Sequence, residues 1–272
     1  MTKTTALVGP RSRDRGPKRR RSALRRHGMI FAGMVFVWAC APGANSTRVA
    51  RSTLVVGIDV SGSFRPNYES SIDFASNYIY ARLHGLGGLK QPTALFVGSI
   101  GGEQPDETKS FQPIHTFQGL TVEQIADYLH KEYPTKDGNT DFNPFFTRVA
   151  ALIKRQNLVL SPVDIVLFTD GLPDTPVERN DTLSKYKQIR LDDLEYLSKS
   201  VTLRVLYPRP TIAVNWEKRV PRHRVRMWTV DDEVMNTWRN QYRDGMPIED
   251  QNALFKWIAD NVDFRVRSVG LL

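Results

Sequence analysis

The sequence predicts an α/β fold, in which a doubly wound, mainly parallel central sheet is flanked by helices and carries one antiparallel strand at its edge. From about residue 52 onward, short apolar runs alternate with segments of helical periodicity, as in a sheet with crossover helices. The first run, residues 54–60, is apolar on both faces, which is typical of a central strand. A later strand at 109–117 contains Pro113, which is best tolerated at an edge.

The remaining elements are expected in a regular order. Apolar residues recur at helical spacing from Ile72 to Leu86, and the glycine-rich segment 85–88 ends this helix. The next helix, 121–133, opens with Thr121 and Gln124, which form a capping pattern. Further strands are predicted at 93–100, 164–169, 201–207 and 225–230, and further helices at 145–153, 191–198, 231–242 and 249–262.

Charge is unevenly distributed along the 272 residues, which carry a formal net charge of +9. Residues 1–51 hold 12 of the 38 Lys and Arg residues but only one of the 29 Asp and Glu residues. The remaining chain therefore holds 26 basic and 28 acidic residues, a net charge of −2. Because the basic character belongs to the N-terminal segment, no nucleic acid is expected as a partner of the folded part.

Residues 1–40 are interpreted as an export leader and 41–51 as a tether, ahead of a domain at 52–267. The apolar run at 29–39 is too short for a membrane-spanning helix, which needs about 20 residues. The chain's single cysteine, Cys40, follows at once, so no intramolecular disulfide is possible. The arrangement resembles a bacterial lipoprotein signal, from which Trp38 departs, and implies lipidation at Cys40 and membrane anchoring in the cell envelope. Ordinary secretion into the periplasm or medium, an uncleaved anchor and a start without export stay open as alternatives.

Polar side chains follow two apolar strands at the point where each strand ends, with a polar loop between them in the sequence. Carboxylate and hydroxyl oxygens suit a hard divalent cation, which takes about six oxygen ligands. In doubly wound sheets, ligands bind outside the carboxyl ends of the strands. Gly62 is expected to permit the turn after the first strand. The candidate metal ligands are Asp59, Ser61, Ser63, Thr140 and Asp170.

Taken singly, each candidate has a simpler explanation. An Asp-x-Ser turn such as the one at Asp59 commonly caps a helix, and Thr140 alone is more often an N-terminal cap than a ligand. Asp170 followed by Gly171 is, by itself, a turn. Their order and their common placement at strand ends favour the metal site.

These three segments, in this order, resemble the von Willebrand factor type A (VWA) domain, a Rossmann-like fold, with its metal-ion-dependent adhesion site (MIDAS). The family pattern is Asp-x-Ser-x-Ser, then a Thr about midway, then an Asp at the tip of a later strand, and all five positions are filled. The resemblance covers about residues 52–264. It implies Mg²⁺, or Mn²⁺ or Ca²⁺, with an open coordination position that an acidic residue of a partner protein fills.

The resemblance implies a non-enzymatic adhesion or scaffold module, with specificity supplied by the loops at 64–68, 137–144 and 171–177. The alternative is an assembly or metal-insertion factor that acts on a partner enzyme complex. Enzyme classes are disfavoured by the residues themselves. A haloacid dehalogenase phosphatase needs an Asp where Ser61 stands, a serine hydrolase needs flanking glycines and a His base, and no phosphate-binding glycine motif is present. The histidines, expected at the surface or partly buried, are His27, His84, His115, His130 and His223.

The segment 208–226 lies outside this pattern. It carries six Lys and Arg residues with Trp216 among them. A solvated loop or hairpin is the simplest expectation, and a contact surface for an acidic partner or anionic lipid is the functional alternative.

Overall fold

The computed structural model describes residues 52–101, 110–135, 138, 140–174, 183–198 and 200–264. The chain divides into two units, Met1–Thr47 and Arg48–Leu272. The first unit lies outside the described residues, and with it the predicted leader, the apolar run and Cys40. Within the described part, no helix has both the length and the apolar character needed to cross a membrane.

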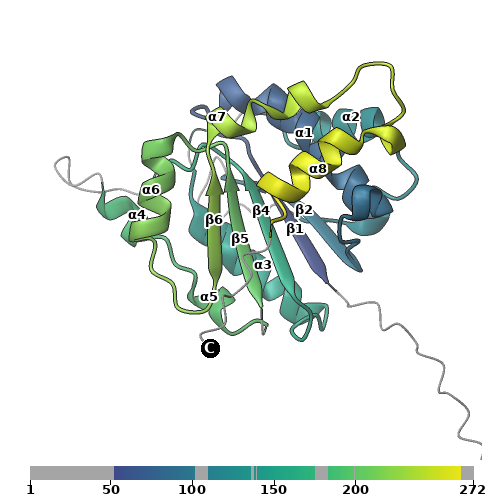
Figure 1. Cartoon of the computed structure of the whole chain (residues 1–272). Coiled ribbons are helices and arrows are strands. Elements are labelled where there is room, and N and C mark those ends of the chain that lie inside the picture. The colour runs from purple at the N-terminus through teal and green to yellow at the C-terminus, as the bar shows by residue number, and fades with distance from the viewer. Residues whose placement is uncertain are drawn as a thin grey trace, which may run out of the picture. The chain divides into compact units, whose positions relative to one another are not determined.

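A six-stranded sheet forms the centre of the second unit (Figure 1). Its order is β3-β2-β1-β4-β5-β6, and all neighbours are parallel except β3, which pairs antiparallel with β2 at the edge. This confirms the predicted doubly wound α/β fold with one antiparallel edge strand. The strands are β1 Thr53–Asp59, β2 Ala94–Ile100, β3 Gln112–Pro113, β4 Val163–Phe168, β5 Val201–Leu206 and β6 Arg226–Val230.

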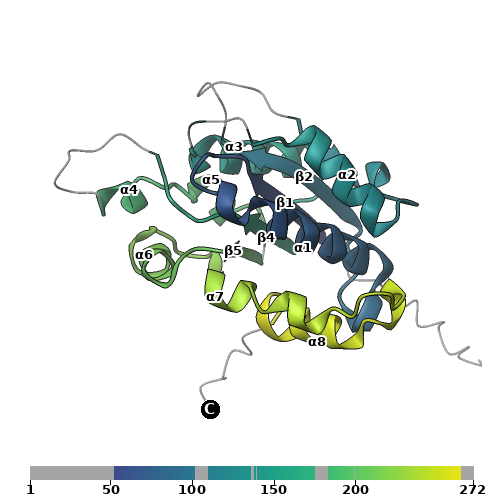
Figure 2. The same ribbon diagram turned by 90° about the horizontal axis from the view of Figure 1, so that it is seen from above.

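Helices cover both faces of the sheet (Figure 2). One face packs against α1 Arg65–His84, α2 Val122–Glu132, α7 Asp232–Met235 and α8 Asn252–Asn261. The opposite face packs against α3 Phe142–Arg155, α4 Ser184–Lys187, α5 Asp192–Glu195 and α6 Pro210–Arg219. Every residue of β1 is buried, because its alternate side chains enter the two cores, and this accounts for its continuous apolar sequence. Short 3-10 helices occupy Leu86–Gly88, Ile114–Thr116, Trp238–Gln241 and Ile248–Asp250.

Local signals place the ends of two helices as predicted. The Thr121 hydroxyl accepts a hydrogen bond from the Gln124 amide, and the Gln124 side chain accepts one from the Thr121 amide, so α2 begins with a capping box. Helix α1 ends at Gly85, whose φ of 65° is readily adopted by glycine.

Several boundaries differ from the sequence-based expectation. The edge strand predicted at 109–117 is only the two-residue β3, followed directly by a 3-10 turn at Ile114–Thr116. The helix predicted at 231–242 is divided into α7 and a 3-10 turn, and the one predicted at 249–262 begins with a 3-10 turn before α8. Short α4 was not predicted at all. Tertiary packing sets the ends of these segments, so local sequence periodicity alone does not predict them.

The expectation of a solvated loop at 208–226 is wrong. Helix α6 occupies most of this segment, begins with Pro210 in its first turn and buries Trp216 completely. The following residues are fixed as well, because the buried Glu195 carboxylate accepts hydrogen bonds from the backbone amides of His223, Arg224 and Val225. The tryptophan is therefore a core residue rather than part of a contact surface.

Candidate functional site

The candidate ligands lie where the sheet topology favours a binding site. β1 is followed by α1 on one face, whereas β4 is followed by α4 and α5 on the other, so the chain leaves these neighbouring strand ends in opposite directions. The register pairs Ile58 with Phe168. Asp59 and the Thr169–Asp170 pair therefore emerge side by side at the topological switch point, where ligands bind in doubly wound folds.

Asp59 is fully buried and held from two sides. Its Oδ1 accepts a hydrogen bond from the Ser61 amide at 2.9 Å, and its Oδ2 accepts one from the Thr169 hydroxyl at 2.5 Å. Burial raises the pKa of the Asp59 carboxyl to about 7, although the hydrogen bonds from Thr169 and Ser61 oppose this shift, and the charge of Asp170 adds to it. The chain therefore orients this carboxylate without supplying a positive charge that balances it.

Ser61 and Ser63 place two hydroxyls beside the carboxylates. Their Oγ atoms lie 3.2 Å apart, and Ser61 is buried whereas Ser63 is exposed. The Ser63 hydroxyl also hydrogen-bonds the Asp170 carboxylate. The expected role of Gly62 is wrong, because its φ is not positive and a Cβ there would meet open space, so other residues can form this turn. The helix-cap alternative also fails here, since Phe64 is the N-cap of α1.

Asp170 follows β4 and is 8% exposed. Its Oδ1 accepts a hydrogen bond from the Leu172 amide at 3.0 Å across a turn at Gly171, whose φ is 73°. Burial raises its pKa, and the nearby Asp174 carboxylate contributes, while Arg209 and the hydrogen bonds from Leu172 and Ser63 oppose the shift. The turn alternative and the ligand hypothesis are thus compatible, because the turn leaves this carboxylate at the strand end.

Thr140 is fully buried, and its Oγ1 has no hydrogen-bond partner. Its backbone is fixed by Asp174: the Thr140 amide donates to Asp174 Oδ2 at 2.8 Å, and the Asp174 amide donates to the Thr140 carbonyl at 2.9 Å. Asp141, not Thr140, is the N-cap of α3, because its side chain accepts from the Asn143 amide at 2.9 Å. A buried hydroxyl without a partner is unfavourable unless a further group binds it.

A divalent cation fits this set of donors. Two desolvated carboxylates offer the two negative charges that such a cation needs, and the serine and threonine hydroxyls are neutral oxygen ligands. Hydrogen bonds link Asp59 to Ser61, Ser61 to Ser63 and Ser63 to Asp170. Thr140 is held by Asp174, whose carboxylate is close enough to Asp170 to raise its pKa. In the described residues no group of three or more His, Cys, Asp or Glu side chains gathers for a metal, so hydroxyls must complete any such site.

The sequence analysis did not single out two residues that shape the site. Thr169 orients Asp59 through its hydroxyl and accepts a hydrogen bond from the Gly171 amide at 3.0 Å. Its position between a buried strand and Asp170 is a signal that could have indicated this role. Asp174 holds Thr140, but it lies in an aperiodic loop after Pro173, and nothing in the sequence pairs positions 140 and 174.

The histidines of the described part are exposed or half-buried, as expected: His84, His115, His130 and His223. His130 Nε2 lies 3.6 Å from the Glu69 carboxylate on α1. His27 lies outside the described residues.

No family model matches the chain, and no curated protein matches it in sequence. Among solved structures, the SpRpn10 VWA domain is 12% identical with a TM-score of 0.41, covering 74% of this chain and 93% of its own. The solved structures that this chain resembles thus include VWA domains. The manganese-loaded Plasmodium vivax TRAP protein is 16% identical with a TM-score of 0.39, over 68% of this chain and 70% of its own. The pilus adhesin SpaC from Lactobacillus rhamnosus GG is 13% identical with a TM-score of 0.43, over 77% of this chain and 30% of its own.

Proposed function

We propose that this chain is a non-enzymatic protein-binding module whose adhesion or scaffold function depends on a divalent cation, Mg²⁺ or alternatively Mn²⁺ or Ca²⁺. The residues that would hold the cation are Asp59, Ser61, Ser63, Thr140 and Asp170. The observation that carries the proposal is the buried Thr140 Oγ1, which has no hydrogen-bond partner. It belongs to a set at the carboxyl ends of the strands that includes two carboxyls, Asp59 and Asp170, whose pKa values are raised by burial. A bound divalent ion would supply a Lewis acid that attracts a carboxylate of the partner protein.

The residues around the site have separate parts in this function. Thr169 and the Ser61 amide fix the orientation of Asp59, which must lose its proton for a cation to bind. Ser63 is the exposed member of the set, so the partner is expected to approach from its side. Leu172, 39% exposed, lies on the same edge and offers an apolar contact. Of the segments expected to supply specificity, 64–68 is not a loop but the N-cap and first turn of α1, and it contributes less because Phe64 and Tyr68 are buried in the core.

A hydrolytic function would need a positioned general base, and the arrangement favours binding instead. Asp59 and Asp170 each accept hydrogen bonds from hydroxyl and amide groups, which leaves neither free to act as a base.

We propose further that Cys40 is lipidated and that the chain acts at the cell envelope. Its intact mass tests this: a lipidated N-terminus at residue 40 is expected, and an unmodified N-terminus upstream of Cys40 would contradict it. Cys40→Ser should release the protein from the membrane or trap the precursor.

Partner capture tests the function directly. A soluble form, residues 41–272, is incubated with cell-envelope extract with and without EDTA, and the proteins lost with EDTA are identified. Surface plasmon resonance against a captured partner should then show binding that vanishes with EDTA and returns with Mg²⁺. Thr140→Ala should weaken binding about tenfold or more, whereas Thr140→Ser, which keeps the hydroxyl, should largely retain it.

Basic side chains outside the site provide the contrasting result. Substitution of Arg222 or Arg224 by Gln should change only the association rate and its salt dependence. Partner affinity could instead survive both EDTA and Thr140→Ala and be lost when Arg219, Arg222 and Arg224 are neutralised together. That result would assign partner binding to the basic segment 208–226 and not to the candidate metal site. A partner that proves to be an enzyme complex would favour an assembly role for the same site.

A further inference from the structure

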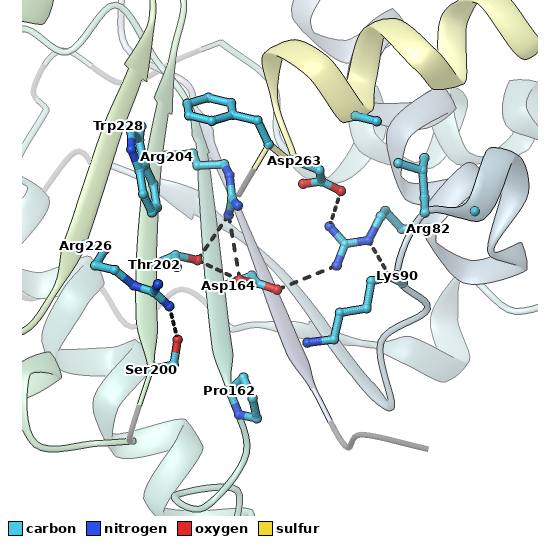
Figure 3. A pocket seen from close by; sticks show the side chains of 14 residues that line it. Arg82, Lys90, Pro162, Asp164, Ser200, Thr202, Arg204, Arg226, Trp228 and Asp263 are labelled. Atoms are coloured by element: carbon cyan, nitrogen blue, oxygen red, sulfur yellow. Dashed lines mark hydrogen bonds and ion pairs between the residues drawn. The ribbon is translucent and has the colours of Figure 1, made fainter. Parts of the chain in front are cut away.

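A second polar site lies at the opposite end of the sheet. A cavity of about 740 Å³ opens beside the first residues of β4, β5 and β6, where it is bounded by the C-terminal ends of α1 and α8 (Figure 3). Cavities of roughly 300–1,000 Å³ are the size of small-molecule sites. None of the candidate metal ligands lines it, so it is a separate feature of the fold.

Alternation along three strands creates one wall of this cavity. The register aligns Asp164 with Thr202 and then with Arg226, and it aligns Arg204 with Trp228. These side chains therefore share one face of the sheet. Farther along the strands the same face is apolar, with Val166, Phe168, Leu206 and Val230 in the core. The change from apolar to charged residues on one face marks the cavity as a polar site within an otherwise apolar layer.

Two buried guanidinium groups form the inner part of the cavity. Arg82 and Arg204 are 2% and 4% exposed. Arg82 donates to the Asp263 carboxylate at 2.7 Å, and the Asp164 carboxylate lies 3.8 Å from Arg82 and 3.7 Å from Arg204. The Thr202 hydroxyl donates to Asp164 at 2.6 Å and accepts from Arg204 at 3.0 Å. The two carboxylates thus balance the two buried arginines.

The outer part of the cavity adds positive charge. Lys90 and Arg226 line the cavity together with the Ser200 hydroxyl, to which Arg226 donates a hydrogen bond. The lining therefore has four basic and two acidic side chains, a net charge of +2. In addition, Arg204 Nε is buried without a hydrogen-bond partner, and its guanidinium lies 5.6 Å from the ring centre of Trp228.

We propose that this cavity binds a phosphate-bearing ligand. A phosphate monoester carries a charge of about −1.5 to −2 near neutral pH, which matches the net charge of the lining. Its oxygens accept hydrogen bonds from guanidinium, ammonium and hydroxyl groups, all of which the cavity provides. Trp228 packs edge-on against Phe264, with ring centres 5.7 Å apart, and this pair forms an aromatic wall for the organic part of the ligand.

The phosphate has two possible sources, a soluble phosphate ester or a phospholipid headgroup. The chain enters the domain at this end, because the Thr53 amide donates to the carbonyl of Pro162, which lines the cavity. The proposed anchor at Cys40 precedes this entry point in the sequence. A headgroup therefore has to be tested beside the soluble esters.

Titration calorimetry tests the proposal on residues 41–272, in EDTA so that phosphate cannot act through a bound divalent cation. The soluble probes are inorganic phosphate and glycerol 3-phosphate, at constant ionic strength set with NaCl. Saturable binding of one equivalent is expected. Arg226→Gln and Lys90→Gln should each weaken it about tenfold, because each removes a charge-assisted hydrogen bond. Arg226 is exposed, so its substitution should leave the melting temperature nearly unchanged.

Arg224→Gln is the matched control, because it removes the same charge two residues away from Arg226, outside the cavity. It should bind both probes as the wild type does. Flotation with phosphatidylcholine vesicles, with and without phosphatidylglycerol, distinguishes the sources: binding that needs phosphatidylglycerol and is lost in Arg226→Gln indicates a headgroup. Absence of saturable binding to the soluble probes and to both vesicle types, or equal weakening by Arg224→Gln and Arg226→Gln, would overturn the proposal. Either result leaves the metal-dependent function untouched.

Discussion

Two aspartates at opposite ends of the sheet, one buried and one half-buried, differ in how their charge is balanced. Asp59 ends β1 and is fully buried, while Asp164 is the second residue of β4 with a side chain that is 17% exposed. Burial alone would raise the pKa of both carboxyls. At Asp164 the hydrogen bond from Thr202 and the charges of Arg204, Arg82 and Lys90 outweigh burial, so its pKa is lowered. At Asp59 burial prevails, and its pKa rises to about 7.

The difference shows which of the two carboxylates has its charge balanced by the chain itself. Around Asp164 the chain supplies cations, so this carboxylate contributes to a structural network inside the domain. Around Asp59 it supplies hydroxyls and amides, which orient a carboxylate but do not balance its charge. A site of the second kind is stabilised by a cation from solution. The contrast therefore separates a carboxylate whose charge the chain balances from one whose charge the chain leaves uncompensated.

Asparagine substitutions should give the largest difference between the two ends. Asp164→Asn leaves Arg82 and Arg204 with one carboxylate fewer, and it should lower the free energy of unfolding by about 3 kcal/mol. Asp59→Asn removes an insufficiently compensated buried charge, so in EDTA it should leave stability unchanged or raise it. Urea unfolding of both variants in EDTA measures this. The exposed Asp127→Asn is the control, with an expected change of about 0.5 kcal/mol or less. Equal losses of unfolding free energy for Asp59→Asn and Asp164→Asn would show that the contrast is wrong.

Addition of a divalent cation should stabilise one end only. At a Mg²⁺ concentration of 100 times Kd, the wild type should gain about 2.7 kcal/mol in unfolding free energy. Asp59→Ala and Asp170→Ala should remove this gain without unfolding the domain, whereas Asp164→Asn should keep it. Thermal melts with Mg²⁺ or EDTA, paired with calorimetry, report both quantities. Unchanged metal binding in both alanine variants would remove the metal-site hypothesis.

The pH dependence of stability should have opposite signs at the two aspartates. In EDTA, folded Asp59 keeps its proton up to about pH 7, whereas the unfolded chain releases it near 3.8. The folded state binds more protons in this window, so Asp59 lowers stability as pH rises from about 4 to 7, by at most about 1.4 kcal/mol per pH unit. Asp164, with its lowered pKa, contributes stability above pH 3.8 that is lost as pH falls below it.

Subtraction of variant curves isolates each contribution. The difference between wild type and Asp59→Asn in urea unfolding should change from about pH 4 to 7 and be constant above it. The difference between wild type and Asp164→Asn should change only on the acid side. Saturating Mg²⁺ should abolish the change between pH 4 and 7, because cation binding requires ionised Asp59 and this carboxyl is then ionised in both the folded and the unfolded state. A first difference that does not vary with pH would contradict the raised pKa of Asp59.

Sequence reasoning located the metal-site candidates because strand ends are encoded locally. An apolar strand followed by Asp59, or by Thr169 and Asp170, can be recognised from adjacent residues, and parallel topology then brings the strand ends together. The partnership of Thr140 with Asp174 was not predictable in this way, since it joins two aperiodic loops across 34 positions.

The charged end of the sheet was missed for a related reason. Arg204 interrupts an apolar strand, which is a signal of a buried charge. The carboxylate that it pairs with, Asp164, lies on another strand, and Arg82, which pairs with the same carboxylate, lies on α1. The helix at 210–219 was missed because most of the basic residues that suggested a solvated loop, Arg209, Arg222, Arg224 and Arg226, lie outside it. Within the helix, Trp216 donates a hydrogen bond to the Gly171 carbonyl at 2.8 Å and so packs α6 against the candidate site.

The smallest expected effect is on Mg²⁺ affinity, from a substitution of Arg209, which directly precedes α6. This exposed residue is the N-cap of α6 without a side-chain cap, so its substitution removes no helix-capping bond. Its charge opposes the rise in the pKa of Asp170, which places it within electrostatic reach of the site, where it also repels an incoming cation. Arg209→Gln should therefore tighten Mg²⁺ binding about threefold at low salt, and the gain should fade toward 1 M NaCl as screening increases. Calorimetry at two salt concentrations measures it, with Arg222→Gln as the control of equal charge. An equal gain in Mg²⁺ affinity in Arg209→Gln and Arg222→Gln would mean that only the net charge of the protein matters, and that Arg209 has no particular effect on the candidate metal site.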